Sequence, residues 1–187
     1  MIFAEFQELE TKDLRLRRLR REDARDYFER LAGSEAVTRY MLFSPHRDIS
    51  ESVASMEKTL RRYEEGNGYR WCIARKVDDR LIGVIDLLRL DAQTESCSFA
   101  YMLAECFWGR GYGTQALKAV LDFAFSDLRV RYVEADHMAE NVASGAVMRK
   151  AGMQYQFTQP AKYEKNGVCH DAPVYRISRQ EKTGGNP

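Results

Sequence analysis

A glycine-rich turn at residues 109–113, with the sequence Gly-Arg-Gly-Tyr-Gly, most constrains what this chain can fold into. It follows an apolar, strand-like run at residues 99–103, and a long helical pattern begins directly after it. Alternating glycines leave their backbone amides unhindered, and the first amides of a helix have no partner within that helix. Because the helix dipole and Arg110 both favour negative charge there, the turn predicts a site for a phosphate or pyrophosphate group.

The composition is that of one ordinary globular domain. The 187 residues are 44% hydrophobic and 30% charged with a net charge of +1, which argues against a general nucleic-acid-binding protein. Arginines at residues 15–21 are interleaved with leucines, and we interpret them as the solvated face of a strand that leads into a helix. The N-terminal segment is acidic, and no run approaches the roughly 20 apolar residues of a membrane span. We therefore expect a cytoplasmic protein with no membrane partner.

Hydrophobic periodicity predicts a single α/β domain at residues 1–180. Ser50 is the expected N-cap of the second helix, and Asn166-Gly167 is a strong signal for a type I′ hairpin turn. Residues 181–187 are predicted to be a disordered tail. The expected strands are 14–19, 69–77, 81–90, 96–103, 132–137, 153–164 and 168–178, and the expected helices are 21–31, 51–63, 117–128 and 141–151.

Several phosphate-binding sites could in principle use such a turn. A P-loop is excluded, because no Gly-Lys-Ser/Thr follows the glycines. A dinucleotide-binding fold, with Glu134 as the acid on the ribose, needs the spacing Gly-x-Gly-x-x-Gly and strands that alternate with helices, and neither is found around this turn. A turn that binds nothing has no need of an arginine and a helix start in this order. The remaining interpretation is a coenzyme A site.

The order of the motifs resembles the GNAT superfamily of N-acetyltransferases, and in particular its RimJ/RimL branch, which acetylates the N-termini of ribosomal proteins. The matching motifs are Trp-Gly-x-Gly-Tyr-Gly-Thr at 108–114, Asn-x-x-Ser at 141–144, Lys-x-Gly-Met at 150–153, and Asn-Gly followed by His-Asp and Tyr at 166–175. The resemblance covers residues 14–178. It implies a GNAT fold, with a mixed, mostly antiparallel twisted sheet of about seven strands flanked by helices on both faces.

The resemblance also implies how acetyl-CoA, the expected co-substrate, is held. The glycine turn receives the pyrophosphate, and one strand splays from its neighbour at 132–137 and offers its main chain to the pantetheine arm. An asparagine and a serine at the start of the following helix contact the arm and face the thiol. The expected cofactor-binding residues are Tyr101, Met102, Leu103, Gly109, Arg110, Gly111, Tyr112, Gly113, Thr114, Asn141 and Ser144. No metal is expected, because the four cysteines lack ligand spacing.

Catalysis in this family is direct attack of a neutral amine on the thioester, which needs a proton acceptor for the amine and a proton donor for the thiolate. The acid that relatives often carry three residues before the strand tyrosine is replaced here by Ser98, so the base is open. Asp136 and His137 are further candidates for it. The expected catalytic residues are Ser144 and Tyr155 as donors and Glu164 as the base.

Fold and cofactor do not choose the acceptor. The RimJ/RimL branch suggests a peptide or protein N-terminal α-amine, and the pocket is expected to form from residues 21–65, including the loop at 40–47, and from the final hairpin. A small-molecule amine (amino sugar, polyamine or antibiotic) is an alternative. A non-catalytic acyl-CoA sensor is another, favoured by the missing acid at Ser98. No direct nucleic-acid partner is expected. Homodimers are common in the family, and the sequence indicates no interface.

Overall fold

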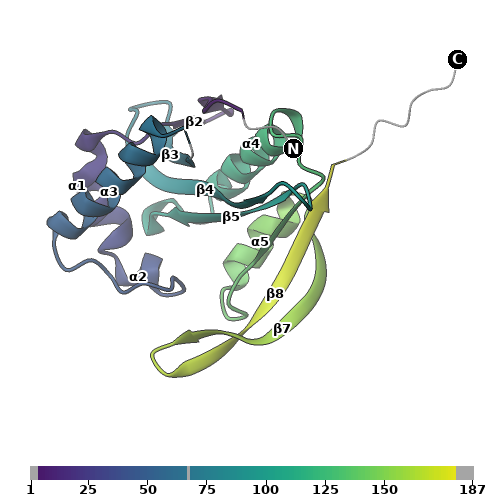
Figure 1. Cartoon of the computed structure of the whole chain (residues 1–187). Coiled ribbons are helices and arrows are strands. Elements are labelled where there is room, and N and C mark those ends of the chain that lie inside the picture. The colour runs from purple at the N-terminus through teal and green to yellow at the C-terminus, as the bar shows by residue number, and fades with distance from the viewer. Residues whose placement is uncertain (1–3, 67, 180–187) are drawn as a thin grey trace, which may run out of the picture.

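An eight-stranded sheet forms the centre of the molecule, in the order β1-β2-β3-β4-β5-β6-β8-β7 (Figure 1). The computed structural model describes residues 4–66 and 68–179, so the tail at 181–187 lies outside the described residues. The sheet has one strand more than expected. Leu9 and Glu10, which precede the first predicted strand, form a short edge strand. The strands are β1 Leu9–Glu10, β2 Leu14–Arg17, β3 Tyr69–Arg75, β4 Leu81–Asp91, β5 Ser96–Leu103, β6 Tyr132–Asp136, β7 Gln154–Lys165 and β8 Val168–Ser178.

The sheet is mostly antiparallel, as expected. Within the described residues, β5 with β6 is the only parallel pair, and every other neighbouring pair is antiparallel. A doubly wound dinucleotide-binding fold needs parallel strands joined by helices. That alternative is therefore wrong.

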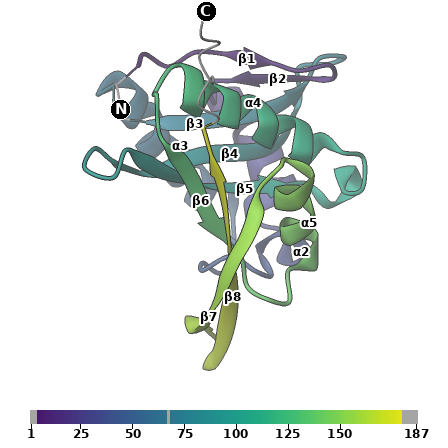
Figure 2. The ribbon, with the colours of Figure 1, turned by 90° about the vertical axis from the view of Figure 1, so that its right-hand side faces the viewer.

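Helices cover both faces of the sheet. They are η1 Arg21–Asp23, α1 Ala24–Tyr27, η2 Phe28–Ala32, α2 Glu35–Thr38, α3 Ile49–Glu64, η3 Glu105–Phe107, α4 Tyr112–Ser126 and α5 Val142–Lys150. Figure 2 shows α4 in front of the sheet and α3 behind it. Trp71 of β3 is fully buried and meets Phe123 of α4 edge-on, with the ring centroids 5.4 Å apart. This contact packs the C-terminal half of α4 against the sheet. In the part of the chain that is described, no helix has the length and apolar character needed to cross a membrane.

Two local predictions are wrong. The N-cap of α3 is Asp48, whose side chain accepts a hydrogen bond from Ser50 N at 2.7 Å, so Ser50 lies inside the first turn. A carboxylate at this place also complements the helix dipole. Arg17 is not on a solvated face: it is 2% exposed and makes two 2.8 Å bonds to Asp23 in the following helical turn. A buried guanidinium needs such a partner, because burial removes its hydration.

β7 and β8 form a long hairpin that projects beyond the rest of the sheet (Figure 2). Its turn residues, Asn166 and Gly167, have φ angles of 52° and 76°, so the type I′ prediction is confirmed. Beside the turn, Lys165 Nζ donates to the carbonyls of Thr38 and Met41, at 2.9 and 2.6 Å. This lysine ties the hairpin to the loop that follows α2. We call that loop (residues 39–47) and the hairpin together the rim.

Candidate active site

A cavity of about 700 Å³ opens where β5 and β6 separate. The two strands pair only at Ser96 with Tyr132 and at Cys97 with Val133, and beyond these pairs they diverge. The predicted splay between these strands is confirmed. Side chains and backbone from the glycine turn, α5, β4 to β7 and the rim all line this one cavity. It therefore joins the predicted cofactor site to the predicted acceptor pocket.

The main chain of β5 faces this cavity at alternate residues. Ala104 N donates to Ile82 O of β4 at 2.8 Å, and in an antiparallel pair the same alternation turns the main-chain groups of Met102 toward β4. Phe99 and Tyr101 have the opposite parity, so their N–H and C=O groups face the cavity. Of the expected pantetheine partners, Tyr101 is thus available, and Met102 lines the cavity but has its main chain engaged with β4. Phe99 is a position that sequence reasoning missed, although strand parity could have found it.

The end of β5 is fixed by the side chain of Trp108, which directly precedes the glycine turn. Trp108 Nε1 donates to the carbonyl of Leu103 at 2.6 Å, while its ring remains 48% exposed. The expected main-chain position at Leu103 therefore already has one partner. This bond sets the start of the glycine turn relative to the strand that it follows.

The glycine turn presents free backbone amides to the cavity. Gly109 and Gly111 have φ angles of 74° and 80°, in the left-handed region that favours glycine. Gly111 is the N-cap of α4 and has no side chain to satisfy the first amides of the helix. Arg110 points elsewhere, with its guanidinium 5.4 Å from the ring centroid of Phe107. The expected turn residues that line the cavity are Gly109, Gly111, Tyr112, Gly113 and Thr114. Such amides fit a pyrophosphate group.

The first turn of α5 brings a serine to a partly buried tyrosine. Asn141 caps the helix through a 3.3 Å bond from Ser144 N to its side-chain oxygen, and both residues line the cavity. The Ser144 hydroxyl is hydrogen-bonded to Tyr101, across the splay. Burial raises the pKa of Tyr101, and the bond from Ser144 partly opposes this shift. Tyr101 is therefore a protonated hydroxyl at neutral pH, on the cofactor side of the cavity.

Lys150 is a cation of the cavity that sequence reasoning did not assign. It lies one turn after Val147 on the same face of α5. Val147 packs near the start of α4, where a Cβ on Gly113 would lie 3.5 Å from it. The spacing from Val147 to Lys150 was the available signal, and it puts a positive charge on the side of α5 that faces the glycine turn.

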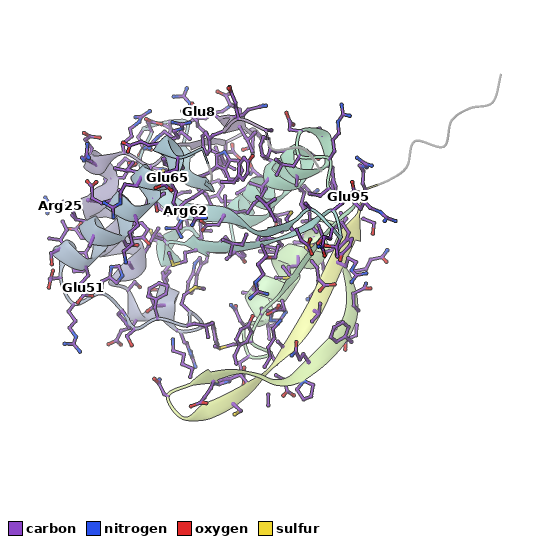
Figure 3. The ribbon with its side chains drawn as sticks, viewed as in Figure 1. Glu8, Arg25, Glu51, Arg62, Glu65 and Glu95 are labelled. Carbon is purple, nitrogen blue, oxygen red and sulfur yellow. The ribbon has the colours of Figure 1, made fainter. Side chains whose placement is uncertain are left out.

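Two of the expected catalytic side chains lie away from the cavity. Tyr155 is 55% exposed and bonds to Thr158, and Glu164 is exposed; neither lines the cavity. Glu95, at the β4–β5 turn in Figure 3, is also outside it. His137 lines the cavity, but its Nδ1 bonds to the Met138 carbonyl and its Nε2 is completely covered. An atom with no accessible surface has no route to a proton of the acceptor.

Asp136 is the carboxylate that the structure brings to the centre of the acceptor side. Lys162 Nζ donates to its Oδ2 at 2.6 Å, and the Tyr163 hydroxyl donates to its Oδ1. Burial and the Asp136 charge both raise the pKa of Tyr163, so this hydroxyl stays protonated. Glu134 also lines the cavity and pairs with Arg176 at 2.6 Å. Both carboxylates of this region are thus held by cations.

The cysteines divide into two reactivity classes. Cys72 and Cys97 are buried, and burial raises the pKa of Cys97 to about 12, whereas Cys106 and Cys169 are exposed. Since the thiolate is the reactive form, we expect Ellman's reagent at pH 8 to modify two thiols of the native protein quickly and the other two only on unfolding. A Cys106→Ser/Cys169→Ser variant should lose the whole fast phase. A third fast thiol would show that the β5 end of the cavity opens to solvent.

No cluster of three or more His, Cys, Asp or Glu that could hold a metal occurs within the described residues.

Known proteins share this arrangement. A family model described as an Acetyltransferase (GNAT) domain matches residues 13–154. The "Probable N-acetyltransferase YjcK" of Bacillus subtilis is 31% identical over 154 residues, which cover 82% of this chain and 81% of that protein. The "Uncharacterized N-acetyltransferase YoaA" of the same organism is 28% identical over 169 residues, covering 90% and 95%. A solved GNAT acetyltransferase from Bacillus anthracis has a TM-score of 0.83 at 16% identity, covering 92% and 98% of the two chains, and so shares the fold.

Proposed function

This chain belongs to the GNAT acetyltransferase family and is an N-acetyltransferase that uses acetyl-CoA, and we propose that its acceptor is the N-terminal α-amine of a polypeptide. The cofactor half of the cavity fits that co-substrate, because free amides of the glycine turn and free main-chain groups of β5 lie along one wall. Acetyl-CoA supplies the thioester that is attacked.

The charges on the acceptor side of the cavity distinguish a polyamine acceptor from a singly charged amine. Related enzymes carry the names "Putative ribosomal N-acetyltransferase YdaF" and "Spermidine N(1)-acetyltransferase", so relatedness alone leaves both open. A polyamine needs carboxylates that are free to bind its several ammonium groups. Here Glu134 is paired with Arg176 and Asp136 with Lys162, each at 2.6 Å. This arrangement supports a singly charged amine.

The proton chemistry also favours an α-amine. A peptide α-amine has a pKa near 7.7–8.0, against about 10.4 for a lysine side chain. A substantial part of it is therefore neutral at physiological pH without a strong base. Lys162 and Arg176 neutralise the two carboxylates, which weakens their tendency to hold a bound amine in its charged form.

We assign the two proton roles to residues that meet in the cavity. The amine attacks the thioester carbonyl; as the new C–N bond forms, its proton passes to Asp136. The backbone amides of Phe99 and Tyr101 face the place where negative charge develops on the carbonyl oxygen. As the C–S bond breaks, the Tyr101 hydroxyl, oriented by Ser144, donates a proton to the sulfur. Ser144, which the sequence predicts to be a proton donor, instead orients the donor Tyr101 in this proposal.

The acceptor is tested by following acetylation of unstructured peptides with free N-termini, alongside spermidine, an amino sugar and peptides with a blocked N-terminus and an internal lysine. Mass spectrometry locates the added acetyl group. We expect the acetyl group on the α-amine. Preferential turnover of spermidine or the amino sugar would replace the proposal with the small-molecule alternative.

Asp136→Asn is expected to lower kcat about 100-fold, because a positioned proton acceptor contributes 10²–10⁴ in rate. The KM for acetyl-CoA should stay unchanged, since the glycine turn is untouched. Glu134→Gln is the matched control, because Glu134 lines the same cavity on the same strand and has no part in the assigned proton transfer; we expect less than about a threefold change in kcat. Steady-state kinetics on the favoured peptide make the measurement. Equal losses in the two variants would contradict the role of Asp136.

A further inference from the structure

The acceptor side of the cavity carries an uncommitted positive charge. Its two carboxylates are paired with Arg176 and Lys162, as described above. Arg89 lines the same cavity and is exposed, and it forms no ion pair or side-chain hydrogen bond with any residue in the ranges 4–66 and 68–179. Such a cation is available to a ligand.

The backbone holds Arg89 in an uncommon conformation at this place. Its φ is 50°, in the left-handed region that a side chain as large as arginine rarely adopts. It follows Leu88, which pairs with Ser98 of β5, and the β4–β5 register shifts directly after this pair. A regular strand would have placed residues 88 and 89 on opposite faces. The irregularity lets both line one cavity.

The charge of Arg89 reaches the hairpin side of the cavity. It acts on Tyr163 of β7 and lowers the pKa of that hydroxyl, against the larger effects of burial and Asp136. Arg89 on β4 and the Asp136 cluster on β6 therefore face the same space from two strands, with β5 between them.

We propose that Arg89 binds a carboxylate of the acceptor, the acidic side chain of the second or third residue of the polypeptide whose α-amine is acetylated; this rests on the proposed function. An extended chain advances about 3.4 Å per residue, so a side chain two or three residues after the α-amine still reaches the cavity that Arg89 and Asp136 both line. A guanidinium can grip a carboxylate through two parallel hydrogen bonds. The same charge repels a polycation.

The test compares peptides that differ only in the side chains of residues 2 and 3. Three otherwise identical peptides carry Glu, Gln or Lys at residues 2 and 3, and release of CoA is followed with each. We expect kcat/KM for the Glu peptide to exceed that for the Gln peptide about tenfold, chiefly through KM, and the Lys peptide to be the poorest. Equal kcat/KM for the Glu and Gln peptides would overturn the proposal.

Variants of Arg89 test whether this residue causes the preference for the Glu peptide. Arg89→Ala should remove the tenfold difference between the Glu and Gln peptides, while Arg89→Lys should retain part of it. Arg25→Ala is the matched control: Figure 3 shows Arg25 on the outer side of the helical layer, where it pairs with Glu29, and the preference should persist. A Glu preference that survives Arg89→Ala overturns the assignment to Arg89.

Failure of the anion site and failure of the proposed function give different results. Turnover of peptides with no preference for Glu contradicts the anion site alone. No turnover of any peptide, together with turnover of a small amine, contradicts the proposed function and the peptide carboxylate with it. Thermal unfolding with acetyl-CoA is run on every variant, so that each result is read on folded, cofactor-binding protein.

Discussion

Gly111→Val should abolish acetyl-CoA binding in a protein that still folds. At 100 times its dissociation constant a ligand adds about 2.7 kcal/mol to stability, which for a domain of this size raises Tm by roughly 5–10 °C. We expect this shift to disappear in the variant. Gly111 is the N-cap of α4 with φ at 80°, and its neighbours in the turn present the amides that receive the pyrophosphate. A branched side chain there covers these amides and drives φ toward negative values.

Gly66→Val is the matched control for Gly111→Val. Gly66 has φ at 69°, close to the value at Gly111, and a Cβ at either glycine would meet no atom within 4 Å. Both variants should therefore lose a similar free energy of unfolding, about 1–2 kcal/mol, from the same backbone strain. Gly66 lies after α3 and does not line the cavity, so only Gly111→Val should lose the acetyl-CoA shift. A full shift in Gly111→Val would refute the assignment of the turn to the cofactor.

Gly83→Ala should destabilise the fold by about 3 kcal/mol, at the upper end of the usual cost of overpacking. A Cβ on Gly83 would lie 2.5 Å from the carbonyl oxygen of Met102 and 3.1 Å from Leu103 Cδ1. β4 is held between β3 and β5, so it cannot move aside without breaking one of its two ladders. Urea unfolding measures the loss. Because the displaced atoms belong to β5 beside the splay, the Tm shift with acetyl-CoA should shrink as well.

Gly113→Ala provides the contrast to Gly83→Ala. Its Cβ would meet Tyr101 and Val147 at 3.5 Å, an ordinary contact distance, and it lies in the first turn of α4. Alanine is the better helix former by up to about 1 kcal/mol, so stability should stay equal or rise. A loss of less than 1 kcal/mol in Gly83→Ala would show that β4 and β5 can separate at this pair.

The fold was predictable to the extent that local patterns express it. The type I′ turn at Asn166 and the strong stripe of α4 each depend on residues close in sequence, and both are present. Arg17 was misplaced because alternation along β2 assigns it to the solvent face. Its true partners are Asp23 in the next helical turn and Asp79, far along the chain in the β3–β4 turn. Such a pair is visible only once the sheet has formed.

The candidate site shows the same division. The cofactor half could be read from motifs, because glycines at positive φ and a helix start are local features. The acceptor half could not. Lys162 and Tyr163 are adjacent in β7, yet both line the cavity, because the β7–β8 register shifts between Gln159 and Tyr163. The in-and-out alternation of side chains along a strand fails at such an irregularity. The partner of Asp136, Lys162, also lies 26 residues further along the chain.

The bond from Lys165 to the loop after α2 makes the rim a closed loop of protein. The hairpin and the loop after α2 are joined by these bonds, and both contribute residues to the cavity that strands β4 to β6 also line. Under the proposed function, the acceptor enters between them by an end. A chain terminus can enter in that way, whereas a lysine in the middle of a folded surface would have to bring its whole neighbourhood with it. For the proposed polypeptide acceptor, the topology of the rim would therefore favour chain ends before any side chain of the substrate is recognised.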